Sequence, residues 1–560
     1  MKFFIKTNWQ VIVLLVVAII FLFIYSWFPY QTTKDGDTRF ASPDGTANYF
    51  WAERYAQGEE LFYFEPLNVV ADDIVIPRSV RSDNGVVKPV SFLGIILIYG
   101  WLGKIFGTNI IIYLTPLFAV IGVLFFYGII KEIFNKKIAF FSALMLFALA
   151  PYWYYTSRSM FHNVLFIDLV MAGVWFLIYK KNVAVPRPYV LMPFLSGIFI
   201  GLAIITRVSE LIWLVPAMLI AWVVYFKEIE WNKLILFACG IFLALMPMLY
   251  YNQILYGDFL DFGYSSPANQ YAEVPNSSLR FASSELSANP EFNDTSLRDK
   301  INNFLPFGFH PRAAWNNFVN YFVIIFWYLF WPAFFGGIWF LYNWKKINKT
   351  QKIYFCSFVV ASIILVTFYG SWVIHDNINL SSITIGNSYT RYWLLMYIMA
   401  IPLAVLFFEK ITNLIKQKYI QNILLYSLII IFLILNIQAA VFAKEECLLV
   451  MKENIIKDKK LANEIINKIE PEAIIINKHF DKYLWPERKV IIDNLSNKNY
   501  YKLYAQLIDK GLPLYYYGFI FQEEALINLN EAKLNKDGLQ IEIINLDEKN
   551  KLGLYQLKVN

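Results

Sequence analysis

The sequence has few charged residues and very few cysteines. Asp, Glu, Lys and Arg make up 16% of the 560 residues, against about a quarter in a typical soluble domain. The three cysteines, Cys239, Cys356 and Cys447, are far apart, which excludes a disulfide framework or a cysteine zinc site. Most basic residues lie in short connections between apolar runs. The net charge of +7 is therefore typical of a membrane protein and does not indicate a nucleic-acid partner.

Apolar residues dominate instead. They make up 58% of the chain, and the mean hydropathy is +0.46. Apolar runs of roughly 17 or more residues recur, and each is long enough to cross a bilayer. We predict an all-α polytopic membrane protein with about 11 transmembrane helices. The predicted spans are 9–28, 109–130, 138–153, 164–179, 189–205, 210–226, 234–251, 315–342, 353–372, 392–408 and 420–442.

Basic connections decide the orientation. If residues 89–107 lie at the outer surface without crossing, all the strongly basic connections fall in the cytoplasm, as the positive-inside rule requires. We therefore predict a plasma-membrane protein with a cytoplasmic N-terminus and an extracytoplasmic C-terminus. The alternative, in which 89–107 cross and another segment does not, stays open. The first span is interpreted as an uncleaved signal anchor, with a cleaved signal peptide as the alternative. The basic connections are 131–137, 180–188, 226–233, 343–352 and 409–418.

A long acidic loop follows the first span, from Pro29 to about Pro89, within a first outer loop 29–108. Loops of this length are usually functional or disordered. The aromatic residues of this loop and a helix-like segment from Asp44 to Gln57 favour a folded and functional one. Asp44 follows Ser-Pro and is expected to be the N-cap of that helix.

Two other polar segments are long. Residues 252–313 are interpreted as a substrate-covering loop, with a disordered spacer as the alternative. From about residue 445 the sequence becomes charged, with a helix-like run at 450–469 and another at 497–511. Together with the β-like runs, these helices predict a small extracytoplasmic α/β domain, residues 445–560, with a binding or docking role. The β-like runs are 473–477, 489–493, 512–518 and 539–544.

Ionisable residues near the outer ends of the spans are candidate functional groups, because charge at membrane depth is expensive. Arg158 and His162 are four residues apart and would share a helix face. A histidine such as His162 is by itself more often a satisfied polar residue than a base. Asp168 either faces a cavity or binds a neighbouring helix. Arg207 and Glu210 either bind a substrate or pair with each other. The full set is Arg158, His162, Asp168, Arg207, Glu210 and Arg391.

These residue types suit one kind of chemistry. A carboxylate near the outer surface can take a proton from an acceptor hydroxyl. Arginines can bind a phosphate through paired hydrogen bonds and stabilise it as a leaving group, and apolar helices can hold a lipid tail. Phosphate leaving an anomeric carbon needs no covalent nucleophile, so one base and one phosphate site suffice.

Several segments, in their order, resemble the GT-C superfamily of integral-membrane glycosyltransferases, which includes protein O-mannosyltransferases and aminoarabinose transferases. The resemblance covers most of residues 1–408, and the tail has none that we can name. It implies that residues 1–444 form a GT-C-like transmembrane catalytic domain. The segments are SPDGTANYFWAERYAQGEELFY, KPVSFLGIILIYGWLGKIFG, ALAPYWYYTSRSMFHNVLFIDLVMAG, GLAIITRVSELIWLVPAML and SYTRYWLLMYIMAIPL.

The resemblance implies roles for individual residues. Asp44 stands where the family has its catalytic base, with Gly45 where a second carboxylate often follows. The acidic residue that the family has before its fourth helix corresponds to Asn163 or Asp168. Arg391 and Tyr392 correspond to residues that contact the lipid phosphate.

Lys88 and Pro89 resemble a segment that lines the same cavity, and Arg207 is a further candidate for the phosphate. Arg78 and Arg81 either join that site or form a solvated basic edge. Some members of the superfamily use a divalent metal such as Mg or Mn, and others do not. Asp35 and Asp37 have the spacing of a metal motif but lie close to the first span, so the metal is left unassigned.

We therefore expect a glycosyltransferase that moves a sugar, with inversion, from a polyprenyl- or dolichyl-phosphate donor to an extracytoplasmic acceptor. The acceptor is a protein, a lipid or a glycan of the cell envelope. Two alternatives stay open: a multi-pass transporter or flippase of a lipid-linked saccharide, and a non-catalytic membrane scaffold. A transporter predicts inverted internal repeats, and none is visible in the sequence.

Overall fold

The computed structural model describes residues 2–178, 191–228, 230–264, 308–374, 376 and 382–560. Its contacts divide the chain into two compact units. The helical unit comprises the described residues of Met1–Gln31, Ile112–Pro247 and Pro275–Met451. The mixed unit comprises those of Thr32–Ile111, Met248–Val274 and Lys452–Asn560. Most of the predicted loop 252–313 lies outside the described residues.

The helical unit consists of apolar helices, some of them joined through short 3-10 or π turns. The α-helices are α1 (Lys2–Thr33), α5 (Ile111–Ile133), α6 (Lys136–Ala148), α7 (Ala150–Arg158), α8 (His162–Ile178), α9 (Leu191–Thr206), α10 (Leu211–Tyr225), α11 (Trp231–Tyr256), α14 (Pro311–Phe318), α15 (Trp327–Tyr342), α16 (Lys349–Gly370), α17 (Ser388–Tyr392), α18 (Leu394–Thr412) and α19 (Lys418–Ile437). The turns are η3 (Val208–Glu210), η4 (Phe226–Glu228), η6 (Val319–Ile324) and η7 (Gln438–Phe442).

The described parts of all the predicted spans fall mainly on helices, so the mostly helical membrane architecture is confirmed. Within the described residues, seven helices are long and apolar enough to cross a membrane, or up to nine if each of two bent pairs is one span. Those pairs bend by 50° between α6 and α7 and by 101° before α15. Helices α8 and α9, of 17 and 16 residues, are about 25 Å long against a hydrocarbon core of about 30 Å. The number of about 11 crossings and the orientation stay predictions.

Close contacts hold helices of this unit together. At the break between α6 and α7, the side-chain oxygen of Asn436 on α19 accepts a hydrogen bond from the Ala150 N–H at 2.7 Å. Gly336 of α15 lies against α18, where an added Cβ would stand 2.1 Å from the Leu403 carbonyl oxygen. The neighbouring Gly337 has room for a Cβ, since its nearest neighbour there, an atom of Phe355, is 3.5 Å away.

The N-terminal part of the mixed unit is the predicted first outer loop, and it is folded. Helix α2 starts at Pro43 with Ser42 in the N-cap position, and it ends at Gly58, whose φ is 82°. The prediction that Asp44 is the N-cap was wrong, because proline is favoured at the first helical position and Asp44 falls in the first turn. The other elements are β1 (Tyr63–Phe64), α3 (Pro66–Val70), β2 (Val80–Asp83), β3 (Val86–Pro89), α4 (Leu93–Phe106) and η1 (Thr108–Ile110).

Strands β2 and β3 form a hairpin with the two-residue turn Asn84-Gly85, in which both φ angles are positive, 48° and 83°. Asn-Gly is the preferred sequence for such turns. The Asp73 carboxylate accepts hydrogen bonds from the N–H groups of Asn84 and Gly85 at 2.7 and 2.8 Å. Helix α4, with 14 residues, is about 21 Å long. That residues 89–107 do not cross the membrane stays a prediction.

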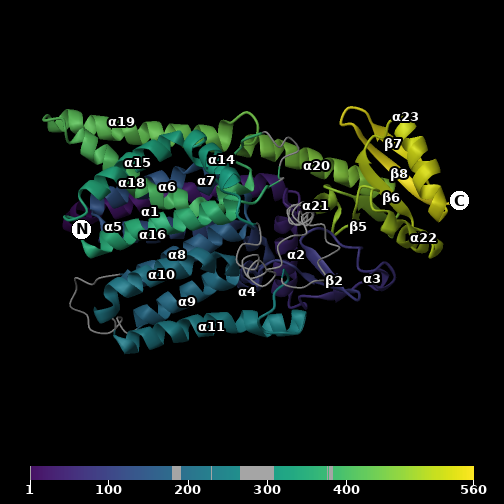
Figure 1. Cartoon of the computed structure of the whole chain (residues 1–560), viewed down its shortest axis with the longest axis horizontal. Coiled ribbons are helices and arrows are strands. Elements are labelled where there is room, and N and C mark those ends of the chain that lie inside the picture. The colour runs from purple at the N-terminus through teal and green to yellow at the C-terminus, as the bar shows by residue number, and fades with distance from the viewer. Residues whose placement is uncertain (1, 179–190, 229, 265–307, 375, 377–381) are drawn as a thin grey trace, which may run out of the picture. The chain divides into compact units, whose positions relative to one another are not determined.

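The C-terminal part contains a five-stranded sheet in the order β5-β4-β6-β8-β7 (Figure 1). Strands β5, β4 and β6 are parallel, and β8 and β7 continue the sheet antiparallel. All four predicted β-like runs are strands, and the last strand, β8, was not predicted. The strands are β4 (Ile474–Asn477), β5 (Lys489–Ile492), β6 (Leu514–Phe519), β7 (Leu539–Asp547) and β8 (Leu552–Val559). The helices are α20 (Leu448–Lys468), α21 (Asp481–Leu484), η8 (Lys498–Tyr500), α22 (Tyr501–Asp509), α23 (Glu523–Asn528), η9 (Leu529–Lys533) and η10 (Leu534–Asp537).

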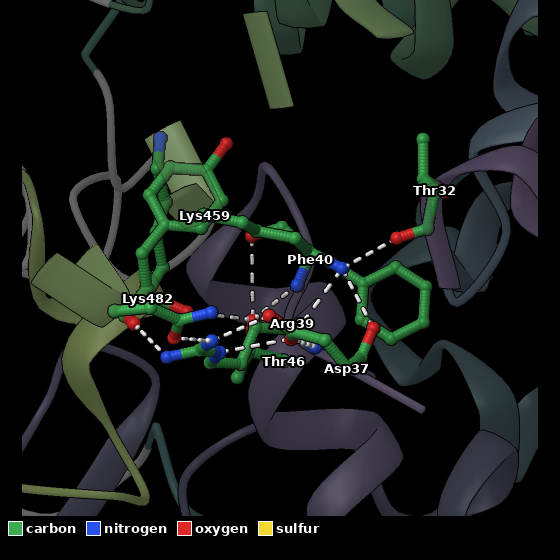
Figure 2. Close-up of polar contacts among 9 residues, drawn as sticks. Thr32, Asp37, Arg39, Phe40, Thr46, Lys459 and Lys482 are labelled. Carbon is green, nitrogen blue, oxygen red and sulfur yellow. Dashed lines mark hydrogen bonds and ion pairs between the residues drawn. The ribbon is translucent and has the colours of Figure 1, made fainter. Parts of the chain in front are cut away.

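The C-terminal sheet and the first outer loop share one hydrophobic core. Ala71, Ile74 and Val75 of the loop are buried in the same cluster as Ile474 and Tyr504 of the C-terminal part. Polar contacts add to this core, as Figure 2 shows for the Lys459 ammonium, which donates to the carbonyls of Thr32 and Asp37 at 2.6 Å each. The predicted division into residues 1–444 and 445–560 stays a prediction, but the tail does not pack by itself.

Candidate functional site

The candidate base, Asp44, lies in the first turn of α2 and is half-buried. Its Oδ1 accepts a hydrogen bond from the Ser79 hydroxyl at 2.6 Å. Ser79 has a φ of 64°, which is strained for a residue other than glycine. Such strained residues cluster at functional sites.

Position 45 has little room for a second carboxylate. A Cβ added to Gly45 would lie 3.0 Å from the Phe40 Cβ, so a larger side chain there would have to move the phenylalanine ring. One turn after Asp44, the buried Asn48 accepts a hydrogen bond from the Ser91 hydroxyl at 2.7 Å. The close packing of Phe40 against residue 45 is therefore compatible with glycine and not with the second carboxylate that the resemblance implies there.

Three basic residues of the first outer loop, Lys88, Arg81 and Arg78, are in ion pairs. Lys88 lies 2.6 Å from Asp83 and donates to the Leu255 carbonyl at 2.5 Å. Arg81 binds the same Asp83 at 2.7 Å. Arg78 pairs with Asp481 at 2.6 Å. These contacts differ from the solvated basic edge considered from the sequence. That Lys88 also contacts a substrate stays a prediction.

Three arginines of the helical unit surround two aromatic rings. The Phe161 ring lies 5.1 Å from the guanidinium carbons of both Arg158 and Arg391. The Tyr392 ring lies 5.0 Å from those of both Arg391 and Arg207. We call these five residues the arginine–aromatic cluster. Thus Arg158, Arg207, Arg391 and Tyr392, which the sequence analysis singled out, come together in one place.

Arg207 carries its own counter-charge. Its Nε donates to Glu210 at 2.7 Å, so the predicted alternative of mutual pairing is confirmed. Nη1 donates to the Asn163 side-chain oxygen at 3.2 Å, and Nη2 donates to the Tyr369 hydroxyl at 2.9 Å. The Tyr369 ring in turn stacks on Tyr392 with centroids 4.4 Å apart. This network fixes the Tyr392 side of the cluster.

Arg158 has a different environment. Its Nη1 donates a hydrogen bond to the Tyr154 hydroxyl at 3.2 Å, three aromatic rings lie around it, and Glu446 acts on it electrostatically. The prediction that Arg158 and His162 share a helix face was wrong. Helix α7 ends at Arg158 and α8 begins at His162, and Ser159 and Met160 between them have φ values of 57° and 55°. His162 is buried at the first position of α8.

Asp168 binds a neighbouring helix, which was one of its two predicted alternatives. Its Oδ1 accepts a hydrogen bond from Tyr152 of α7 at 2.7 Å, and the side chain is only 3% exposed. A Cβ added to Gly122 of α5 would lie 2.3 Å from the same oxygen. Asp168 therefore packs between α5 and α7.

The cluster favours an anion. Arg207 pairs with Glu210, and Glu446 acts electrostatically on Arg158, while the rings of Phe161 and Tyr392 lie against the three guanidinium groups. Planar guanidinium groups bind phosphate through two parallel hydrogen bonds, and partial exclusion of water strengthens such contacts. The arrangement is thus chemically suited to a phosphate.

No metal site is evident in the part of the chain that the structure describes, where no three His, Cys, Asp or Glu side chains lie together as ligands. Asp37, one half of the Asp35–Asp37 spacing, accepts hydrogen bonds from Arg39 and lies 3.4 Å from Lys459. The use of Mg or Mn stays a prediction.

Sequence reasoning did not find Phe161, Tyr369, Ser79 and Asp481. Phe161 and Tyr369 gave a weak signal, since Phe161 lies in the polar segment between two apolar runs and Tyr369 lies near the end of one. Ser79 and Asp481 gave none, because their roles depend on contacts with residues distant in the sequence.

Comparison with known proteins gives three findings. Residues 93–251 match the model of the dolichyl-phosphate-mannose-protein mannosyltransferase family. The fold resembles the archaeal oligosaccharyltransferase AglB from Archaeoglobus fulgidus, in complex with an inhibitory peptide and a dolichol-phosphate, with a TM-score of 0.52 and 11% identity over 98% of this chain and 74% of that chain. It also resembles ArnT from Cupriavidus metallidurans bound to undecaprenyl phosphate, with a TM-score of 0.51 and 10% identity over 98% of both chains. No curated protein matches the sequence.

Proposed function

We propose that this chain transfers a sugar from a polyprenyl-phosphate donor. Its predicted resemblance to the GT-C superfamily of membrane glycosyltransferases is confirmed by the family match and the fold. The acceptor is an extracytoplasmic protein, lipid or glycan. The observation that carries the proposal is the arginine–aromatic cluster, which gathers cations around Phe161 and Tyr392.

The cluster binds the donor phosphate. Arg158 and Arg391 share one ring and supply two guanidinium forks toward the same region. Arg207 is held by Glu210, so it orients Tyr392 and contributes less net charge. The apolar helices of the helical unit accommodate the isoprenoid chain. Both neighbouring structures named above are described with a polyprenyl or dolichol phosphate, which supports the same donor class here.

Asp44 is the base. Its carboxylate takes the proton from an acceptor hydroxyl, and the freed oxygen forms a bond to the anomeric carbon of the sugar. The bond from that carbon to the phosphate oxygen breaks, and its electron pair leaves with the phosphate, which the arginines stabilise. Because this is a single displacement, the configuration at the anomeric carbon inverts.

The test separates binding from transfer. The full chain in lipid nanodiscs is titrated with undecaprenyl phosphate, and transfer is followed with radiolabelled dolichyl-phosphate mannose and a membrane extract as acceptor. We expect Arg391→Gln and Arg158→Gln to weaken undecaprenyl phosphate binding at least tenfold. Asp44→Asn should bind the lipid normally and lose transfer by a factor of 100 or more, within the range that general bases contribute, about 10² to 10⁴.

The matched control is Lys410→Gln. Lys410 also lies over an aromatic ring, that of Trp339, with its ammonium 4.4 Å from the centroid, but it belongs to a cytoplasmic connection in the predicted topology. This variant should bind and transfer as the parent does. Equal transfer by Asp44→Asn and the parent would refute the assigned base. Movement of a lipid-linked sugar across liposomes without transfer would support the flippase alternative instead.

A further inference from the structure

A fully buried carboxylate from the C-terminal part of the mixed unit contacts the loop that holds Asp44. Asp481 begins α21 and is 0% exposed. Its Oδ2 accepts the backbone N–H of Arg78 at 2.9 Å. Its Oδ1 accepts from Arg78 Nε at 3.0 Å and from Nη2 at 2.6 Å. One side chain therefore fixes both the main chain and the guanidinium group of Arg78.

The residue after Arg78 is the strained Ser79. A left-handed backbone at a serine persists only when its surroundings hold it there. Asp481 supplies that constraint directly before the turn, through Arg78. The carbonyl of His479 accepts a further hydrogen bond from Arg78 Nη2 at 3.1 Å. The hydroxyl of Ser79 then reaches the Asp44 carboxylate at 2.6 Å. The contacts form a continuous series from Asp481 through Arg78 and Ser79 to Asp44.

The same short segment also packs on the helix that carries Asp44. The Thr46 hydroxyl lies 3.3 Å from the Lys482 carbonyl oxygen, as Figure 2 shows. The Trp485 ring lies 4.4 Å from that of Phe50, centroid to centroid. Two independent sets of contacts, one to the Ser79 turn and one to α2, thus join residues 481–485 to the two elements that position the carboxylate.

We propose that Asp481 is a positioning residue for the transfer reaction, holding Arg78 so that the Ser79 hydroxyl orients the Asp44 carboxylate. The proposal rests on the function proposed above and adds to it a role for the C-terminal part, which the sequence analysis assigned only to binding or docking. Asp481 acts at a distance from the reacting atoms. A displacement of the base by about 1 Å is enough to lower the rate by about 100-fold.

The test compares three variants of the full chain in nanodiscs, with radiolabelled dolichyl-phosphate mannose as donor. Asp481→Asn keeps the shape of the side chain but removes its charge. We expect its turnover at saturating donor to fall at least tenfold, while the KM for the donor and the affinity for undecaprenyl phosphate change less than twofold. Ser79→Ala should show the same pattern. The double variant should be no slower than the slower single variant, because both changes interrupt the same series of contacts.

Asp493→Asn is the matched control for a purely structural role. Asp493 is also buried in the C-terminal part and accepts hydrogen bonds from the Tyr504 hydroxyl at 2.8 Å and the Leu495 N–H at 3.1 Å. Its loss should lower thermal stability and leave the turnover of the folded protein unchanged. If Asp481→Asn lowers stability but keeps normal turnover, as the control does, the positioning role is refuted.

Failure of the proposed function gives a different result. In that case neither the parent nor Asp44→Asn transfers the sugar, or both transfer it equally. If Asp481→Asn does not fold, Ser79→Ala decides. If Ser79→Ala turns over as fast as the parent, Arg78 does not act on Asp44 through the Ser79 hydroxyl, and the positioning role is refuted.

Discussion

Replacing Arg78 with methionine tests how far the mixed unit depends on one buried ion pair. The variant loses the guanidinium bonds at 3.0 and 2.6 Å but keeps the backbone N–H bond at 2.9 Å. Asp481 stays fully buried without its counter-ion. Breaking a buried pair in this way costs about 3–5 kcal/mol. The lower end, about 3 kcal/mol, applies because one hydrogen bond remains and the Arg78 side chain is 18% exposed.

The pH dependence of the free energy of unfolding is a second test of Arg78→Met. Burial raises the pKa of Asp481, but the charge and hydrogen bonds of Arg78 outweigh it and hold the pKa below its usual value of 3.8. The ionised pair therefore stabilises the fold above the unfolded pKa, and this contribution is lost as the pH falls through the folded pKa. In Arg78→Met the buried carboxyl becomes protonated more easily. The difference in stability between parent and variant should therefore shrink as the pH falls toward about 4 and below it.

Hydrogen–deuterium exchange in the full chain measures the effect. The amides of β4, which lies just before Asp481, should exchange about a hundredfold faster in Arg78→Met, since 1.4 kcal/mol is about a factor of ten. Glu542→Gln is the control, because it removes a pair with Lys558 in which both side chains are over 40% exposed. Such exposed pairs contribute about 1 kcal/mol or less. If Arg78→Met accelerates exchange no more than Glu542→Gln, the buried pair is not a major source of stability.

Three further predictions concern other contacts. Burial lowers the pKa of Lys459 to about 8, although the nearby Asp37 carboxylate acts in the opposite direction. Because the unfolded chain keeps this proton up to about pH 10, the free energy of unfolding should rise between about pH 8 and about pH 10. Lys459→Met should abolish that rise in chemical denaturation. Asn436→Leu should leave the Ala150 N–H unbonded at a helix break and lower stability by about 1–3 kcal/mol in a detergent unfolding titration. If the variant keeps the stability of the parent, another group must satisfy the Ala150 N–H. Gly336→Ala should lower the thermal midpoint because its Cβ would overlap a backbone oxygen, whereas Gly337→Ala should be neutral or stabilising; equal effects would contradict the close contact.

Much of the secondary structure could be predicted from the sequence. The predicted apolar spans fall on helices, the helix-like segment from Asp44 to Gln57 lies within α2, and the four predicted C-terminal strands are strands. These features depend on the hydropathy and conformational preferences of neighbouring residues, which are visible in any short window. The helix break between Arg158 and His162 was missed. It depends on positive φ angles at Ser159 and Met160, and neither residue is a glycine, the residue type that usually indicates such a conformation.

The candidate site was only partly predictable. Charge at the ends of apolar runs pointed to Arg158, Arg207 and Arg391, since the cost of burying charge marks such residues whatever the tertiary structure. The choice between pairing and substrate contact for Arg207 needed the structure, which brings Glu210 to 2.7 Å. The aromatic partners were not found, because ring contacts have no spacing rule across separate helices.

The sequence by itself determined that this chain is a helical membrane protein with a long acidic loop after the first span and a strand-containing tail, because hydropathy and residue period are local properties. Only the tertiary structure decided that residues 71–79 of that loop and residues 474–485 of the tail form one body. The buried Asp481 finds its counter-ion about four hundred residues earlier in the sequence. A buried charge requires a partner, but nothing in the local sequence of either residue says which partner the fold will supply.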